Sequence, residues 1–236
     1  MVLVTLLVAA IEETQAAFTV AGIGASYGNQ AANQAAIDLG GAVTRISEGT
    51  YDAMTVAQLR ANYDVLLFTW ASADLNADWA TRIQPYLALG GGVLFEDDNN
   101  IGDLSAVVTL GPTTFGGAYT LSGPSALTAG VTGNFVNDHF GFSAWNSAFT
   151  SFITDNGANT VGLYSTAFGG RILLTGPDQD YHASPGDGDQ YEFLKNELRW
   201  VLGGSAAAVP EPSAMAIWGL CAVGMAVVVR RRKRVL

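Results

Sequence analysis

Cysteine and positive charge are scarce in this sequence of 236 residues. The single cysteine, Cys221, lies inside an apolar run, which excludes an intrachain disulfide and a cysteine metal cluster. Five of the eleven basic residues lie together near the end of the sequence, at Arg230, Arg231, Arg232, Lys233 and Arg234. The remaining six basic residues stand against 21 acidic ones, so the rest of the chain would repel phosphate backbones, and no nucleic-acid partner is expected.

Apolar residues and glycine are abundant. Hydrophobic residues make up 49% of the chain and charged residues only 14%, with 28 glycines. A chain of this composition can bury a sizeable core, which excludes intrinsic disorder for most of its length. The length fits one α/β domain with accessory segments better than two full domains.

Residues 213–229 contain no charged side chain. As a helix they would span about 25 Å, which is short but sufficient to cross a bilayer. The basic cluster at 230–236 follows at once, and the positive-inside rule places such a cluster in the cytoplasm. The pattern therefore predicts one transmembrane helix with the acidic body outside. A buried core helix is the alternative, but no second charge-free run exists to pack against it.

The segment just before this apolar run carries a motif. Residues 205–212 form a linker of small residues that ends in Val209-Pro210-Glu211-Pro212, and Ser213 follows. This motif, the apolar helix and the terminal basic cluster together resemble the PEP-CTERM sorting signal. The resemblance implies that Pro210, Glu211 and Pro212 are recognised and processed by an exosortase, a transpeptidase-like membrane enzyme. Two prolines also hold the backbone extended, as a processing site requires.

At the other end, residues 2–11 are apolar, and the small residues Ala16 and Ala17 precede Phe18. This pattern is typical of a secretory signal peptide over residues 1–17, which the Sec machinery would export. It is atypical because no basic residue follows Met1 and because Glu12 and Glu13 come after the apolar run. A buried first β-strand of the domain is the alternative interpretation.

Between the two ends, residues 18–204 alternate short apolar runs with helical patterns, which predicts an α/β fold with a parallel sheet flanked by helices, either flavodoxin-like or amidotransferase-like. The stretch between residues 99 and 159 is rich in Gly, Thr and Ser and predicts irregular loops and edge strands. The predicted strands are 18–25, 43–46, 64–70, 93–95, 160–165 and 171–175, and the predicted helices are 30–39, 56–63, 77–89 and 190–202.

Several sequence segments of this body resemble segments of class I glutamine amidotransferase-like and trehalose-utilisation-like domains. They are YDVLLFTW at 63–70, YLALGGGVLFEDDNN at 86–100, GRILLTGPDQDYH at 170–182 and NELRWVLGG at 196–204. The resemblance covers about residues 18–204 and implies their α/β fold. Where the amidotransferases place a nucleophilic cysteine after a strand, this chain has acidic and amide residues at 96–100. Glutaminase chemistry as that family performs it is therefore excluded.

Two groups of polar residues follow predicted strands and could meet at the carboxyl edge of the sheet, where ligands bind in such folds. They are Glu96, Asp97, Asp98, Asn99 and Asn100 after one strand, and Asp178, Asp180 and His182 after another. If the protein is an enzyme, Asp97, Asp98, Asp180 and His182 are the candidate catalytic residues. The alternative is that these residues end strands and cap helices, as Asp and Asn commonly do.

A second acidic group is a candidate calcium or magnesium site, and no other cofactor is expected. It consists of Asp178, Asp180, Asp187 and Asp189, which surround a glycine-containing loop. The spacing does not match an EF-hand, and a solvated turn that caps the last helix is the alternative. His139 lies among aromatic residues, where a hydrogen-bonded structural imidazole is the commoner role.

The sequence therefore predicts an exported, non-catalytic surface or extracellular-matrix protein that is sorted through its tail. The expected partners are the Sec machinery, an exosortase-like enzyme, the inner membrane and exopolysaccharide. The body would lie in the periplasm while anchored and reach the cell surface after processing. Two alternatives remain, an envelope hydrolase that acts on carbohydrate and a single-pass membrane protein whose tail is never processed.

Overall fold

The computed structural model describes residues 17–24, 29–69, 79–96, 104–111, 117–135 and 140–203. The predicted signal peptide, apart from residue 17, and the whole PEP-containing tail from residue 204 onward lie outside the described residues. None of the helices in the described ranges has the length and apolar character that crossing a bilayer requires.

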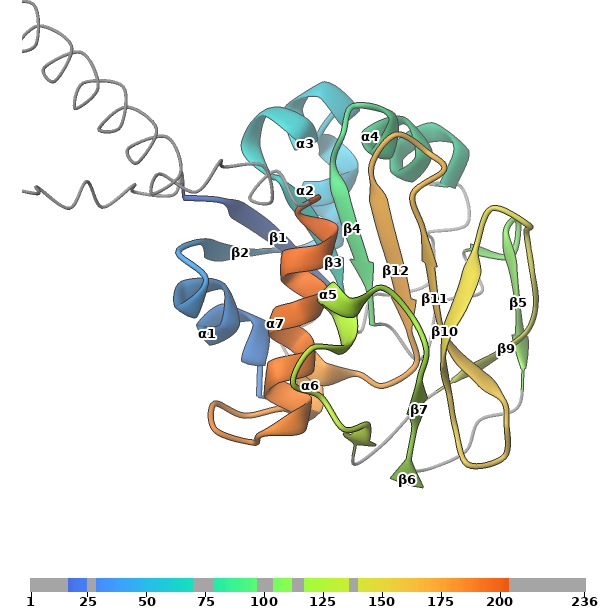
Figure 1. Ribbon diagram of the computed structural model, residues 1–236. Coiled ribbons are helices and arrows are strands. Elements are labelled where there is room, and N and C mark those ends of the chain that lie inside the picture. The colour runs from blue at the N-terminus through green and yellow to red at the C-terminus, as the bar shows by residue number, and fades with distance from the viewer. Residues whose placement is uncertain are drawn as a thin grey trace, which may run out of the picture. The chain divides into compact units, whose positions relative to one another are not determined.

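A central sheet forms the middle layer of the body (Figure 1). Its main path runs in the order β2-β1-β3-β4-β12-β11-β10-β7, and the first five of these strands are parallel. β3 and β4 are buried along their whole length because helices cover both faces, which explains their unbroken apolar sequences. The bounds of the parallel strands are β1 Thr19–Ile23, β2 Ala42–Ile46, β3 Val65–Phe68, β4 Gly92–Phe95 and β12 Arg171–Thr175.

The other half of the sheet is antiparallel, so the predicted parallel sheet is confirmed for the first five strands and does not extend to this half. The reason is the length of the connections: β10 and β11 are joined by only five residues, whereas a parallel pair needs a crossover of a dozen or more. The strands are β5 Val108–Gly111, β7 Thr120–Leu121, β9 Gly141–Trp145, β10 Thr150–Thr154 and β11 Thr160–Ser165. A separate small ribbon pairs β6 Gly117–Ala118 with β8 Asn134–Phe135.

Helices cover the two faces of the parallel half, and each face has its own apolar core. On one face, α1 (Ala31–Asp38), α5 (Ser125–Thr128) and α7 (Asp189–Val201) contribute buried side chains to a single cluster. On the other face the contributing elements are α2 (Glu48–Ala53), α3 (Val56–Asn62), a π-helical turn η2 (Trp79–Ile83) and α4 (Gln84–Ala88). The short helix α6 (Gln179–His182) packs against α1 and α7.

The predicted helix over residues 77–89 is two elements, because the π-helical turn η2 precedes α4 and Pro85 lies at the start of α4. Proline removes a backbone donor and is tolerated in a first helical turn. α2 was not predicted. Ser47 starts it by accepting a hydrogen bond from the amide of Thr50, a common N-terminal cap.

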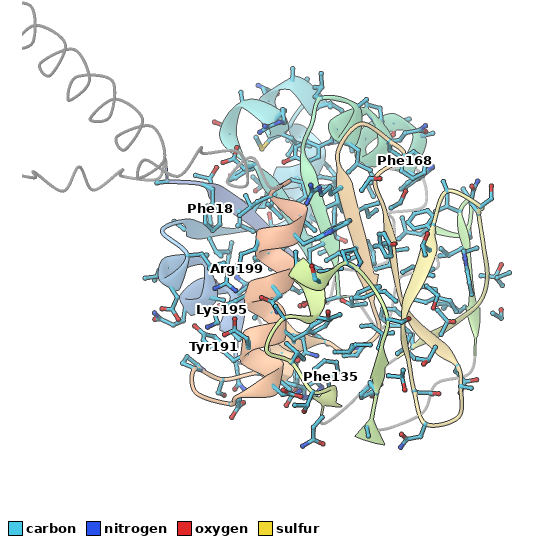
Figure 2. The ribbon with its side chains drawn as sticks, viewed as in Figure 1. Phe18, Phe135, Phe168, Tyr191, Lys195 and Arg199 are labelled. Atoms are coloured by element: carbon cyan, nitrogen blue, oxygen red, sulfur yellow. The ribbon has the colours of Figure 1, made fainter. Side chains whose placement is uncertain are left out.

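Helix α7 lies against β4 and β12 and is the longest described helix (Figure 1). Tyr191, Lys195 and Arg199 recur every fourth residue along one side of it (Figure 2). Gly92 permits the close approach of its last turn, since a Cβ there would lie 2.3 Å from the carbonyl oxygen of Val201. The predicted helix over residues 190–202 is thus confirmed to within a residue at each end.

Candidate functional site at the carboxyl edge of the sheet

The alternation of side chains along β4 and β12 decides which polar groups meet α7. Leu94 and Leu173 belong to the apolar cluster on the α7 face, so Glu96 and Thr175, each two residues further on, point to that same face. The strands are paired with Leu174 opposite Phe95, which sets Thr175 beside Glu96. Both side chains are completely buried.

Helix α7 brings a second glutamate to this place. Glu197 follows Phe193 by four residues and precedes Val201 by four, so it lies on the face of α7 that packs on the sheet. Its side chain is 0% exposed, as is that of Glu96. Two carboxyl groups from distant parts of the chain therefore meet inside the protein.

Hydrogen-bond donors are too few for two ionised carboxylates here. Oε2 of Glu96 accepts a hydrogen bond from the amide of Asp180 at 2.9 Å. Among the described residues, Oε1 of Glu96 and both oxygens of Glu197 have no such donor when both groups are ionised. A proton on one carboxyl supplies the missing donor and allows a hydrogen bond between the two side chains.

Burial is the main cause that raises the pKa of Glu96 well above its usual value, and the nearby charges of Glu197 and Asp180 raise it further. Burial also raises the pKa of Glu197, and the charge of Asp178 adds to this. The nearby carboxyl of Glu96 and hydroxyl of Thr175 offset part of the rise in the pKa of Glu197. The Thr175 hydroxyl itself donates to the carbonyl of Phe95, at 3.4 Å. Both shifts favour the protonated form of a carboxyl in this pair.

Asp180 has a different environment from the two glutamates. Its carboxylate forms a bidentate ion pair with Arg45 on β2, with both Nη to Oδ distances at 2.8 Å. Oδ1 also accepts a hydrogen bond from the amide of Ala32 in the first turn of α1, at 2.9 Å. The Arg45 side chain passes over Gly22, where a Cβ would lie 2.6 Å from its Cδ. This ion pair ties α6 to β2 and α1.

The carboxylates of the other predicted acids also accept hydrogen bonds from backbone amides. Asp178 accepts a hydrogen bond from the amide of Tyr181 at 3.1 Å and so caps α6. Asp187 accepts one from the amide of Ser184 at 2.7 Å. These contacts close turns, which is the capping role considered as the alternative.

Asp189 lies at the start of α7 and holds the segment before β8. It accepts hydrogen bonds from the amide and the hydroxyl of Thr132, at 2.8 Å and 2.6 Å, and from the amide of Asn134 at 2.7 Å. Partial burial opposes ionisation of Asp189, but these hydrogen bonds outweigh it and lower its pKa.

The structure does not assemble the predicted metal site. Asp178, Asp180, Asp187 and Asp189 all lie in the described part of the chain, where no group of three or more His, Cys, Asp or Glu side chains is arranged to hold a metal ion.

Of the candidate catalytic set, only Asp180 and His182 are described. The His182 ring lies 4.7 Å from the ring of Tyr181, centroid to centroid. The other candidates in the predicted groups, Asp97, Asp98, Asn99, Asn100 and His139, lie outside the described residues.

Glu96 and Asp180 are among the polar residues that follow two predicted strands and could meet at this edge, and the backbone amide of Asp180 does donate to Glu96. Glu197 and Arg45 are not among the residues that the sequence singled out. Glu197 could have been found from its phase, since it stands among the apolar positions of α7. Arg45 lies within a predicted strand, and its sequence context does not indicate a partner 135 residues away.

Chemically, this arrangement can hold a proton inside the body. Neither Glu96 nor Glu197 presents an oxygen to solvent, and Asp180 is 2% exposed, so none of the three can contact a substrate in this conformation. Catalytic acids and bases must lie within hydrogen-bond reach of the group they act on. These three acids therefore contact other groups of the protein at the carboxyl edge of the sheet.

Solved structures share this arrangement of helices and strands. A cytoplasmic protein of Salmonella typhimurium LT2 matches with a TM-score of 0.60 at 13% identity, covering 78% of this chain and 99% of that one. A Thermoplasma acidophilum protein assigned as part of a GMP synthase matches with 0.54 at 12% identity, covering 82% and 96%. A ThuA-like protein from Bacteroides uniformis matches with 0.50 at 14% identity, covering 79% and 93%.

No family model and no curated protein matches the sequence. The solved structures and the sheet topology show that the body has a mixed α/β fold of the amidotransferase-like kind, with a central sheet flanked by helices. At these identities the likeness concerns the fold alone.

Proposed function

We propose that the protein is an exported, non-catalytic surface or extracellular-matrix protein whose α/β body is a binding or structural domain. The observation that carries this proposal for the body is the internal use of the acids at the carboxyl edge. Glu96 and Glu197 face each other inside the body, and Asp180 is paired with Arg45. Acids that are buried and bonded to other parts of the protein are not exposed to a substrate.

The proposed destination rests on the tail sequence. The Pro210-Glu211-Pro212 motif, the charge-free run at 213–229 and the basic cluster at 230–236 occur in the order of a PEP-CTERM signal. Sec export, anchoring in the inner membrane with the body in the periplasm, and release by an exosortase-like enzyme follow from that resemblance. Exopolysaccharide is the partner that fits an acidic matrix protein after release.

The sorting proposal is tested by Glu211→Ala in cells that carry an exosortase. The parent should lose its apolar tail near residues 210–213, which intact-mass measurement of the mature protein would detect. The variant should stay in the membrane fraction at its full mass, because the processing element is altered. Ser205→Ala, in the linker outside the motif, is the matched control and should mature like the parent.

Maturation of Glu211→Ala at the parent's rate would contradict recognition through this motif. The non-catalytic assignment has its own contrary result. Hydrolysis of a glycoside or an ester by the full chain, lost in Asp98→Asn, would instead establish an envelope hydrolase.

A further inference from the structure

The contact between α7 and the carboxyl edge of the sheet contains two carboxyl groups, and no cation in the described part of the chain pairs with either. Glu96 comes from the end of β4 and Glu197 from the middle of α7, and both are 0% exposed. Three of their four oxygens have no donor among the described residues when both groups are ionised. Leaving buried acceptors unsatisfied is costly, and burying two like charges side by side is more costly still.

A single shared proton reduces both difficulties, because it leaves one negative charge in place of two and one oxygen without a donor in place of three. It neutralises one carboxyl and provides the hydrogen bond that joins the two side chains. We propose that Glu96 and Glu197 form a carboxylic acid–carboxylate pair that fastens α7 to the carboxyl edge of the sheet and weakens when its proton is lost in alkaline solution. The pair acts as a latch whose closed form contains the proton.

The surroundings of the pair favour retention of that proton. From the α6 segment, Asp178 and Asp180 face it, and both add negative charge. From β12, Thr175 adds a hydroxyl but no charge. Arg45 on β2, the cation that neighbours Asp180, has both Nη groups bound to that carboxylate.

The remaining elements packed on α7 bring no cation to the pair. From α1, Asp38 accepts a hydrogen bond from the hydroxyl of Tyr191 at 2.7 Å, on the outer part of α7. Arg171 of β12 donates to the carbonyl of Trp200 near the other end of the helix. α5 and β8 carry no titratable side chain.

The buried hydroxyl of Tyr86 and the hollow beside α2 already have hydrogen-bond partners. The Tyr86 hydroxyl donates to the carbonyl of Tyr63 at 2.9 Å, so its burial is already satisfied. A hollow beside the turn between α2 and α3 is lined by Met54, Thr55 and Arg82, but the Arg82 guanidinium is engaged by the carbonyls of Tyr51 and Met54. The polar groups of these two features have hydrogen-bond partners, whereas three oxygens of the acid pair have none when both carboxyls are ionised.

The test compares the full chain with the double variant Glu96→Gln, Glu197→Gln, in which two amides can hydrogen-bond to each other without a titratable proton. If the native pair holds one proton that the unfolded chain has lost, the unfolding constant of the parent rises about tenfold per pH unit relative to the double variant, between about pH 5.5 and 7.5. Denaturant unfolding at several pH values measures this ratio. A ratio that stays constant over this range would overturn the proposal.

Glu192→Gln is the matched control on the same helix. Glu192 bonds to Lys195 and Arg199, which lower its pKa, so its change should leave the tenfold slope intact. A loss of slope in this control as well would also contradict the assignment to Glu96 and Glu197.

Infrared spectroscopy supplies a readout that does not depend on unfolding. In the full chain with isotope-labelled glutamate carboxyls, the C=O band of a protonated acid should be present at pH 6.5 and absent from the double variant. If the double variant does not fold, the band at pH 6.5 is measured in the parent and in Glu197→Gln. Its absence from the parent would overturn the proposal, and its presence in the parent with loss in Glu197→Gln would support it.

Discussion

Two pairs of charged or ionisable side chains lie next to each other at the carboxyl edge and differ in one respect. Asp180 faces the guanidinium of Arg45, whereas the charged side chains near Glu96 among the described residues are the acids Glu197 and Asp180. The amide of Asp180 donates to Glu96, so the two pairs are neighbours through one residue. A buried acid is stabilised by a cation where the fold supplies one, and by a proton where the fold does not.

The largest effect should come from breaking the pair that has a cation. Arg45→Met would leave the Asp180 carboxylate buried with only the amide of Ala32 as a partner. Removing one member of a buried ion pair costs about 3–5 kcal/mol, and we expect about 3 because the Arg45 side chain is 17% exposed. Denaturant unfolding of the full chain at pH 7 measures the loss.

Arg199→Met is the control for this prediction, because the Arg199 side chain is 47% exposed where it bonds to Glu192. Its loss should stay below about 1 kcal/mol. Equal losses in the two variants would show that the Arg45 pair has no special importance.

The pair without a cation should respond in the opposite sense. Because the pKa of Glu197 is raised, its contribution is complete below the unfolded value of 4.5 and is lost as the pH rises toward the folded value. Glu197→Met should therefore be more stable than the parent at pH 8, by more than about 1 kcal/mol, and no more stable at pH 4. Unfolding at the two pH values is the measurement, and a variant that is less stable at both would contradict this account.

The smallest effect concerns Asp189, whose pKa is lowered by hydrogen bonds rather than raised by burial. A lowered pKa gives stability that is present above the unfolded value of 3.8 and is lost as the pH falls below it. Asp189→Ala should cost about 1 kcal/mol at pH 7 and much less at pH 3. A double-mutant cycle with Thr132→Val isolates the interaction, and additive losses would refute the coupling.

Much of the parallel half of the fold could be predicted from the sequence, because its central strands β3 and β4 are buried on both faces and its helices are periodic. The segments that form β3 and β4 are unbroken apolar runs, β12 is apolar at residues 172–174, and the helix over residues 190–202 has a clear apolar face. The antiparallel half could not be predicted in this way. Its short strands between residues 108 and 154 depend on pairing with distant partners, such as β5 with β9, more than on local sequence.

The candidate site shows the same limit. That Glu96 and Asp180 could meet follows from the rule that parallel strands end at one edge, and the amide of Asp180 donates to Glu96. The partners that decide what each acid does, Arg45 for Asp180 and Glu197 for Glu96, come from another strand and another helix. Their placement depends on packing, which a single sequence does not display.

The central claim, that the acids at the carboxyl edge are internal and are distinguished by their partners, is tested most directly by carbon-13 NMR titration of the glutamate carboxyl groups in the full chain. Signals are assigned with Glu96→Gln, Glu197→Gln and Glu192→Gln. We predict that the Glu96 and Glu197 signals titrate above pH 4.5 and the Glu192 signal below it. If all three carboxyl groups titrate together near pH 4.5, the edge is open to solvent and the account is wrong.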